Sequence, residues 1–170
     1  MIKDFQGELV IVGHSERNTA YCESDENIAE KFNMIKKNNM TPLLCVGENL
    51  IEREAGIMEK VVSEQIKTIL DLYGQDIFKG SIIAYEPIWA IGSDSAASPE
   101  QIEKMCEFIK QLIHTNVRDN NDVNIVYGGS VNAKNAVQLC EINGVDGILM
   151  GRASLDANEF YEICNSIHKI

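Results

Sequence analysis

A carboxylate suited to proton transfer stands at the end of a buried, strand-like run of this 170-residue sequence. Glu86 follows the nearly continuous apolar run at residues 81–85 and is itself followed by Pro87 and Trp89. A carboxylate in such a place is partly removed from water, which suits a general base. The alternative is a structural carboxylate that closes the strand. We favour the base, because proteins built from repeated strand–helix units carry their catalytic groups at the carboxyl ends of the strands.

A histidine occupies a similar place after another run. His14 follows residues 9–13 and precedes Ser15-Glu16-Arg17, where we expect a helix to begin. The amides and dipole of a helix start disfavour positive charge on the ring, so we expect a neutral imidazole that can donate to a carbonyl oxygen. Without the motif described below, a solvated loop histidine would be the better interpretation. His114 and His168 keep that interpretation.

The elements that must position these groups are read from hydrophobic patterning. Five β-rich runs, at residues 8–12, 41–46, 81–86, 123–127 and 145–150, are each followed closely by glycine. They are continuously apolar rather than alternating, which is typical of parallel strands covered on both faces. Helical patterns fill the gaps, so the prediction is an α/β fold of five parallel βα units in one domain, residues 1–170. Patterning alone fits an open doubly wound sheet or part of a barrel, and a complete eight-unit barrel needs at least about 200 residues.

Two helix starts carry capping signals. Ser98, followed by Pro99 and later by Gln101, predicts a capping box with proline at the first helical position. Asp156 and Glu159 predict a second box, with Leu155 and Phe160 as a hydrophobic staple around it.

Composition excludes several classes of protein. Fifteen Lys and Arg against 26 Asp and Glu give a net charge of −11, and the basic residues are scattered, so we expect neither a nucleic-acid partner nor an anionic membrane surface. The sequence shows no signal peptide and no apolar run of membrane-spanning length. Five dispersed cysteines without a Cys-x-x-Cys pair indicate reduced thiols rather than disulfides or a zinc site. We therefore expect a cytoplasmic protein with no bound metal.

Five segments, in order and spread over nearly the whole chain, resemble the triosephosphate isomerase family. They are Val12-Gly13-His14-Ser15-Glu16-Arg17, Cys45-Val46-Gly47-Glu48, Ala84-Tyr85-Glu86-Pro87-Ile88-Trp89-Ala90-Ile91-Gly92, Tyr127-Gly128-Gly129-Ser130-Val131-Asn132, and residues 146–155 from Asp146 to Leu155. The resemblance covers the family's fourth to eighth βα units. It implies a partial TIM (β/α)8 barrel that is open rather than closed, because the first three units have no counterpart. Met1 would then be an internal methionine of a longer chain or the start of a truncated gene.

The resemblance also implies a reaction of glycolysis and gluconeogenesis, the interconversion of dihydroxyacetone phosphate and D-glyceraldehyde 3-phosphate without metal or organic cofactor. Glu86 matches the family's base and His14 its neutral electrophile. Triosephosphate isomerases are themselves the standard example of this pairing, so the assignment is carried over from the family. Ser15 is expected to be a resting partner of Glu86, while Glu16 and Tyr127 support the site without touching the reacting atoms.

Phosphate binding is the second chemical theme. The resemblance points to the main-chain amides of Gly92, Ser130, Gly151 and Arg152, and backbone amides can hold a dianion in a chain of net charge −11. The alternatives are a tight turn at Gly128-Gly129 and close strand–helix packing at Gly151. Three such corners at one end of a sheet favour the phosphate interpretation.

The sequence departs from the family in three places. Residues 93–97 read Ser-Asp-Ser-Ala-Ala where the family's mobile loop usually carries a Gly-Lys-containing stretch, and Arg152 stands where a second glycine is common. The asparagine and lysine of the family's first strand have no match. We therefore expect this chain to have little or no activity by itself, and the family's homo-oligomeric state is left open. The alternative function is a non-catalytic phosphate-binding or assembly fragment that complements an amino-terminal partner.

Overall fold

The computed structural model describes residues 1–92, 97–118 and 122–168, and its strands and helices alternate along the chain. The strands are β1 (Leu9–Val12), β2 (Thr41–Val46), β3 (Ile82–Tyr85), β4 (Asn124–Tyr127) and β5 (Gly147–Ile148). The α-helices are α1 (Ser15–Tyr21), α2 (Asp25–Lys37), α3 (Leu50–Glu54), α4 (Met58–Tyr73), α5 (Pro99–Asn116), α6 (Ala136–Cys140) and α7 (Ala157–Ile167). Short 3-10 helices are η1 (Lys3–Phe5), η2 (Ile88–Ala90) and η3 (Arg152–Leu155).

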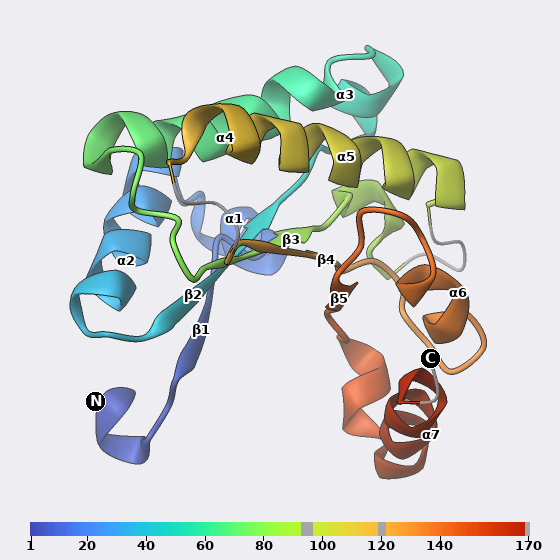
Figure 1. The fold of residues 1–170 in the computed structure, drawn as a ribbon. Helices are drawn as coiled ribbons and strands as arrows, with labels where there is room; N and C mark the ends of the chain where they lie inside the picture. The colour runs from blue at the N-terminus through green and yellow to red at the C-terminus, as the bar shows by residue number, and fades with distance from the viewer. Residues whose placement is uncertain (93–96, 119–121, 169–170) are drawn as a thin grey trace.

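The five strands form one parallel sheet in sequence order, β1-β2-β3-β4-β5 (Figure 1). This confirms the predicted α/β fold of five parallel βα units. Among the described residues β1 and β5 each pair with a single neighbour, so the sheet is open at both edges. The sheet twists strongly: in Figure 1, β1 points upward and β4 runs across the view, whereas the chain beyond β5 turns down toward α7.

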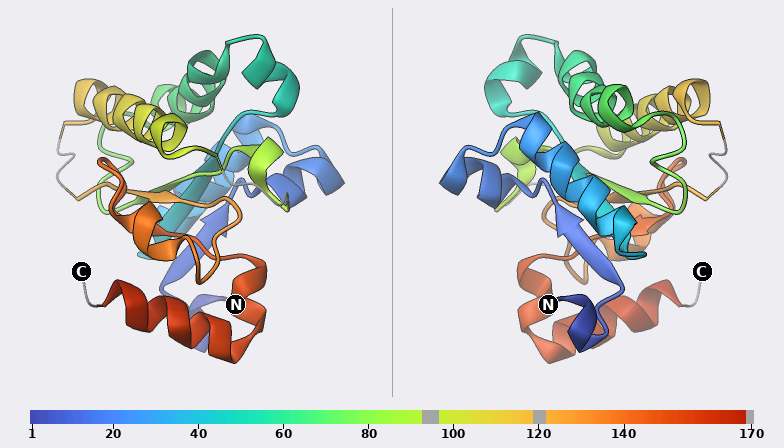
Figure 2. Two further views of the ribbon diagram at one scale, coloured as in Figure 1. Left: turned by 90° about the vertical axis from the view of Figure 1, so that its right-hand side faces the viewer. Right: turned by 90° about the vertical axis from the view of Figure 1, so that its left-hand side faces the viewer.

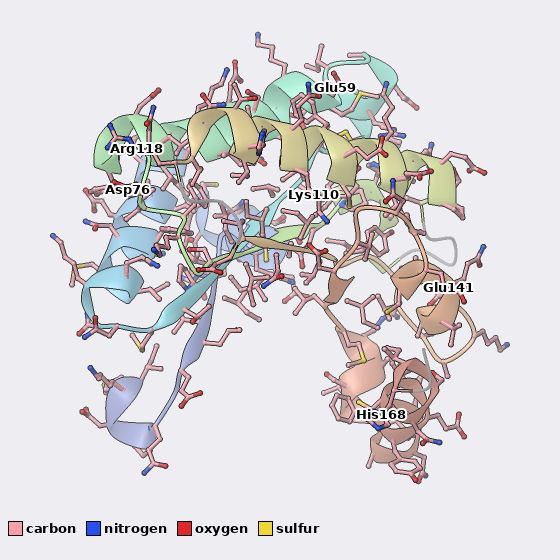
Figure 3. The ribbon with its side chains drawn as sticks, viewed as in Figure 1. Glu59, Asp76, Lys110, Arg118, Glu141 and His168 are labelled. Carbon is pink, nitrogen blue, oxygen red and sulfur yellow. The ribbon has the colours of Figure 1, made fainter. Side chains whose placement is uncertain are left out.

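The fifth strand is shorter than the six residues predicted for it. Asp146, just before β5, accepts the main-chain N–H of Ile125 with its side chain at 2.8 Å and pairs with Lys110 of α5 at 2.9 Å. Lys110 is labelled on α5 in Figure 3. The regular ladder comprises Gly147 and Ile148, with single main-chain bonds on either side of it, from Asp146 N to Ile125 O at 2.7 Å and from Leu149 N to Tyr127 O at 2.8 Å.

The outer face of the sheet is a complete hydrophobic layer. Its side chains lie beneath α2, α4 and α5, which cover this face in Figures 1 and 2. Each of the following is at most 4% exposed: Val12, Leu44, Val46, Ile83, Tyr85, Ile125 and Tyr127. Burial of this layer supplies the main stabilisation of the fold.

The inner face is covered much less. Leu43, Cys45 and Ala84 form a small buried cluster on the middle strands, and no helix residue belongs to it. On the edge strand β1, Leu9 and Ile11 remain 46% and 45% exposed. The sheet therefore has a finished outer layer and an unfinished inner one.

The first predicted helix cap is confirmed and the second only in part. At the start of α5, the Ser98 hydroxyl accepts from Gln101 N and the Gln101 side chain accepts from Ser98 N, which is a capping box. At α7, Asp156 accepts from the amides of Asn158 and Glu159, but Leu155 is 87% exposed and forms no staple. The helices in the described part of the chain include none that is long and apolar enough to span a bilayer.

Replacing Ser98 by alanine tests the importance of the α5 cap. Ser98→Ala removes the acceptor for Gln101 N, so we expect the free energy of unfolding to fall by about 1 kcal/mol. Urea denaturation measures the change. Ser63→Ala in the interior of α4 is the matched control and should leave the stability unchanged or slightly higher, because alanine favours helix interiors.

Candidate active site

The carboxyl ends of β1 and β3 bring the two predicted proton-transfer groups together. Glu86 directly follows β3, and His14 follows β1 after Gly13. Gly13 has φ of +75°, and a Cβ there would lie 3.0 Å from the carbonyl oxygen of Cys45, so glycine permits the turn out of β1. His14 Nε2 lies 3.5 Å from Glu86 Oε1. The two side chains therefore meet across the end of β2.

The ring of His14 is oriented by the start of α1. His14 is the N-cap residue, and its Nδ1 accepts the main-chain N–H of Glu16 at 3.3 Å. A neutral ring that accepts at Nδ1 carries its hydrogen on Nε2, the atom that faces Glu86. That hydrogen is available to a carbonyl oxygen placed between the two side chains.

Glu86 is a buried carboxylate. It is 4% exposed, and its Oε2 atom is buried without a hydrogen-bond partner among the described residues. Burial raises its pKa, and the nearby charge of Glu16 adds to the rise. His14, the Cys45 thiol and the main-chain N–H of Ser15 oppose the rise without cancelling it. An unpaired buried oxygen is uncommon in proteins, and at a strand end it marks an atom free to take a proton.

Glycine contacts hold Glu86 in place. A Cβ on Gly128, just after β4, would lie 2.9 Å from Glu86 Cγ, so the side chain lies directly on that glycine. The main-chain N–H of Glu86 donates to Val46 O at 2.8 Å, so the hydrogen bonds between β2 and β3 continue as far as Glu86. The sequence reasoning had not assigned Gly128 or Cys45 to the site, although both stand in the motifs that it quoted.

The three predicted supporting residues take different places. Ser15 is buried, and its main-chain amide acts on Glu86. Glu16 is exposed and orients His14 through its own amide. Tyr127 is on the outer face, where its hydroxyl accepts the N–H of Ala97 at 3.3 Å and burial raises its pKa to about 12. Tyr127 therefore contacts Ala97, which lies just before α5, by a hydrogen bond on the face of the sheet opposite Glu86.

Two of the predicted phosphate-binding residues lie on connected loops. Ser130, after β4, has φ of +46°, and its hydroxyl donates to the carbonyl of Ala90 at 2.6 Å. Gly92, two residues beyond Ala90, is exposed with φ of +69°. The altered loop at residues 93–97 lies outside the described residues except for Ala97.

The other two residues predicted to bind phosphate lie on η3 and its cap. Gly151 and Arg152 are exposed, and Gly151 is the N-cap residue of η3. In Figure 1 the chain turns from β5 down to α7 at this point. The structure thus brings His14 to Glu86 and Ser130 to the loop of Gly92, while the part of Gly151 and Arg152 in a phosphate site stays a prediction.

A second buried carboxylate supports the chain just beyond Glu86. Glu48 is fully buried, and it accepts from Trp89 Nε1 at 2.9 Å and from the Tyr85 hydroxyl at 3.2 Å, with Arg53 3.4 Å away. Burial raises the pKa of Tyr85, so its hydroxyl remains a donor. In the sequence, Glu48 stands in the Cys45-Val46-Gly47-Glu48 motif, but that motif does not indicate its contacts with Tyr85, Trp89 and Arg53.

The remaining histidines lie apart from this site. His168 is exposed at the end of α7 in Figure 3, and His114 is exposed on α5. Within the described residues, no three His, Cys, Asp or Glu side chains are grouped closely enough to hold a metal ion.

Comparison with known proteins assigns the family. The family model described as triosephosphate isomerase matches residues 1–167. The chain belongs to the triosephosphate isomerase family. It is 46% identical over 168 residues to a triosephosphate isomerase of Vesicomyosocius okutanii, covering 98% of this chain and 67% of that protein. It is 43% identical over 169 residues to that of Legionella pneumophila strain Paris, covering 99% and 68%.

Membership of the triosephosphate isomerase family confirms the predicted resemblance and the enzyme class, an isomerase. The chain spans about two thirds of the length of these relatives. Five parallel strands in an open sheet agree with a partial TIM barrel.

Because the pKa of Glu86 is raised, we expect its ionisation to lower the free energy of unfolding as the pH rises. A glutamate whose pKa is higher in the folded than in the unfolded state stabilises the fold most at pH values below its unfolded-state pKa, which is about 4.3. That contribution is lost as the pH rises through the folded-state value. Glu86→Gln should therefore increase the free energy of unfolding at neutral pH relative to the unmodified chain, with the difference shrinking toward pH 4.

Urea denaturation across this pH range measures the effect. Glu30→Gln, on the exposed face of α2, is the control for loss of one negative charge. Equal effects of the two substitutions at every pH would contradict the assignment of Glu86 as a carboxylate destabilised by burial.

Proposed function

We propose that this chain carries the proton-transfer centre of a triose-phosphate isomerase, with Glu86 as the base and His14 as the neutral electrophile. The observation that carries the proposal is the approach of His14 Nε2 to 3.5 Å from Glu86 Oε1, with Glu86 Oε2 buried and without a hydrogen-bond partner in the part of the chain that the structure describes. A carbonyl compound bound beside this pair would present its oxygen to His14 and its neighbouring carbon to Glu86.

The reaction then follows as two proton transfers. Glu86 takes a proton from C1 of dihydroxyacetone phosphate while the Nε2–H of His14 donates to the carbonyl oxygen at C2, which forms an enediol or enediolate. Glu86 returns the proton to C2, and the hydroxyl proton at C1 passes through His14 to the oxygen at C2 as C1 becomes the aldehyde of glyceraldehyde 3-phosphate. A base whose pKa is raised by burial, as that of Glu86 is, takes up a proton more readily.

Phosphate recognition is proposed to rest on main-chain donors. The hydrogen bond between Ser130 and Ala90 joins two loops and supports Gly92 and Ser130 as part of the phosphate site. Main-chain amides can bind a dianion without side-chain cations, which suits a chain of net charge −11. Gly151 and Arg152, at the start of η3, are proposed to complete the site with their amides.

Low activity of the 170-residue chain by itself is part of the proposal. Its sheet is open at both edges, and the sequence has no match to the family's first-strand asparagine and lysine. Loss of one group that stabilises developing charge costs about 10²- to 10³-fold in rate. We also propose a cytoplasmic location, since all five cysteines are free.

Isomerase activity should appear when the chain is co-expressed with the first three βα units of a full-length relative such as the Legionella pneumophila enzyme. In that complex, Glu86→Gln should lower kcat by about 10²- to 10⁴-fold, because it removes the base, and His14→Gln should also lower it. Interconversion of dihydroxyacetone phosphate and glyceraldehyde 3-phosphate is the measurement, with Glu30→Gln as the control. Full activity of Glu86→Gln would contradict the proposed base.

A second function, assembly without catalysis, is favoured by the unpaired edges of β1 and β5 and by the exposure of Leu9 and Ile11. The same co-expression separates the two functions. A soluble complex that binds inorganic phosphate but shows no turnover would support the assembly fragment, whereas restored turnover supports the isomerase.

A further inference from the structure

The backbone next to Glu86 has a pairing requirement that no strand meets. Beyond the end of β2, Val46 O accepts from Glu86 N at 2.8 Å and Glu48 O accepts from Ile88 N at 3.0 Å. Because successive residues of an extended strand direct their peptide groups to opposite sides, the N–H and C=O of Gly47 are directed away from β3. The neighbour on that side is β1, which ends at Val12, opposite Leu44, so β1 supplies no partner at this level.

Gln65 of α4 supplies the missing partner. Its Oε1 accepts the N–H of Gly47 at 3.0 Å, and its Nε2 donates to the carbonyl of Gly47 at 3.1 Å. The side-chain amide thus takes the role that the peptide group of a neighbouring strand would have. Since Gly47 is buried, removing Gln65 would leave a buried donor and a buried acceptor unpaired.

Gly47 is also in direct contact with the main chain of Glu86. A Cβ on Gly47 would lie 2.0 Å from the carbonyl oxygen of Glu86, so no side chain separates the two backbones. On its other side, Glu86 lies against Gly128, whose N–H donates to Tyr85 O at 2.9 Å. With so little free space, a displacement of the Gly47 peptide is transmitted to Glu86.

We propose that Gln65 is a positioning residue for Glu86, acting through the two hydrogen bonds that hold the Gly47 peptide against the Glu86 backbone. The proposal rests on the proposed function, in which Glu86 is the base. The side-chain amide of Gln65 hydrogen-bonds to Gly47 and, within the described residues, to neither Glu86 nor His14, so its effect is on the placement of the carboxylate and not on the proton transfer itself.

Carbon-detected NMR of the 170-residue chain tests this placement without requiring activity. Gln65→Leu removes both hydrogen bonds, and we expect the titration midpoint of the Glu86 carboxyl to fall toward its ordinary value as the side chain moves off Gly128 and water enters. The His14 ring-nitrogen shifts should change with it. Gln65→Met, which is close to glutamine in length but lacks the amide, also removes both hydrogen bonds without adding a charge, so its effect should be in the same direction.

Ile69→Val is the matched control. Ile69 is fully buried on the same helix, and the substitution weakens the core without touching Gly47. It should lower the free energy of unfolding and leave the Glu86 titration unchanged. Gly47→Ala, which forces the Glu86 backbone to move, provides the reference spectrum of a displaced Glu86.

Two outcomes overturn the proposal. One is a Glu86 titration in Gln65→Leu that matches the unmodified chain while stability falls as in Ile69→Val. The other, should Gln65→Leu not fold, is an unshifted titration in Gln65→Met. In the co-expressed complex, Gln65→Leu should lower kcat roughly 10- to 100-fold with little change in KM. A shifted titration combined with full activity of Glu86→Gln would refute the proposed base and leave the Gln65–Glu86 coupling intact.

Discussion

The structure depends on keeping one carboxylate buried in a defined place at the end of a parallel strand. Desolvation works against the charged form of Glu86, and the surrounding donors only partly offset it. Gly47 lies against the main-chain carbonyl of Glu86 and Gly128 against its side chain, each at a distance that no larger residue would permit. The chemistry proposed for the site is therefore a consequence of tight backbone packing on both sides of one residue.

The layers of the sheet divide stability from function. The outer face packs beneath α2, α4 and α5 as a complete hydrophobic layer, and it holds Tyr85, Tyr127 and the buried Glu48. The inner face carries Glu86 and Cys45 but leaves the apolar side chains of β1 exposed. The open sheet can thus preserve the His14–Glu86 geometry, because the strands β1, β2 and β3 that determine it are mutually paired. The last loop follows β5, an edge strand with a single neighbour among the described residues.

Buried polar groups at the strand ends are satisfied by side chains rather than by further strands. Gln65 pairs with Gly47, Asp146 with the amide of Ile125, and Glu48 with Trp89. Each of these contacts lies beside a boundary of regular strand pairing. The Gln65 and Glu48 contacts lie at the carboxyl ends of the strands, next to the loops on which the candidate site is built.

The sequence by itself determined the five strand–helix units, the α5 cap and the placement of His14 and Glu86 at strand ends, because these depend on local patterns and on the direction of parallel strands. It also carried the family's motifs, which the comparisons confirmed as family membership. Only the tertiary structure decided that Gln65 reaches Gly47, that Cys45 and Gly128 enclose Glu86, and that β5 is reduced to two residues. These contacts join residues that are 18 to 42 positions apart, as in Gln65 with Gly47 and Gly128 with Glu86. Their existence depends on how each helix is rotated against the sheet and on where neighbouring strands end, and no local pattern encodes either.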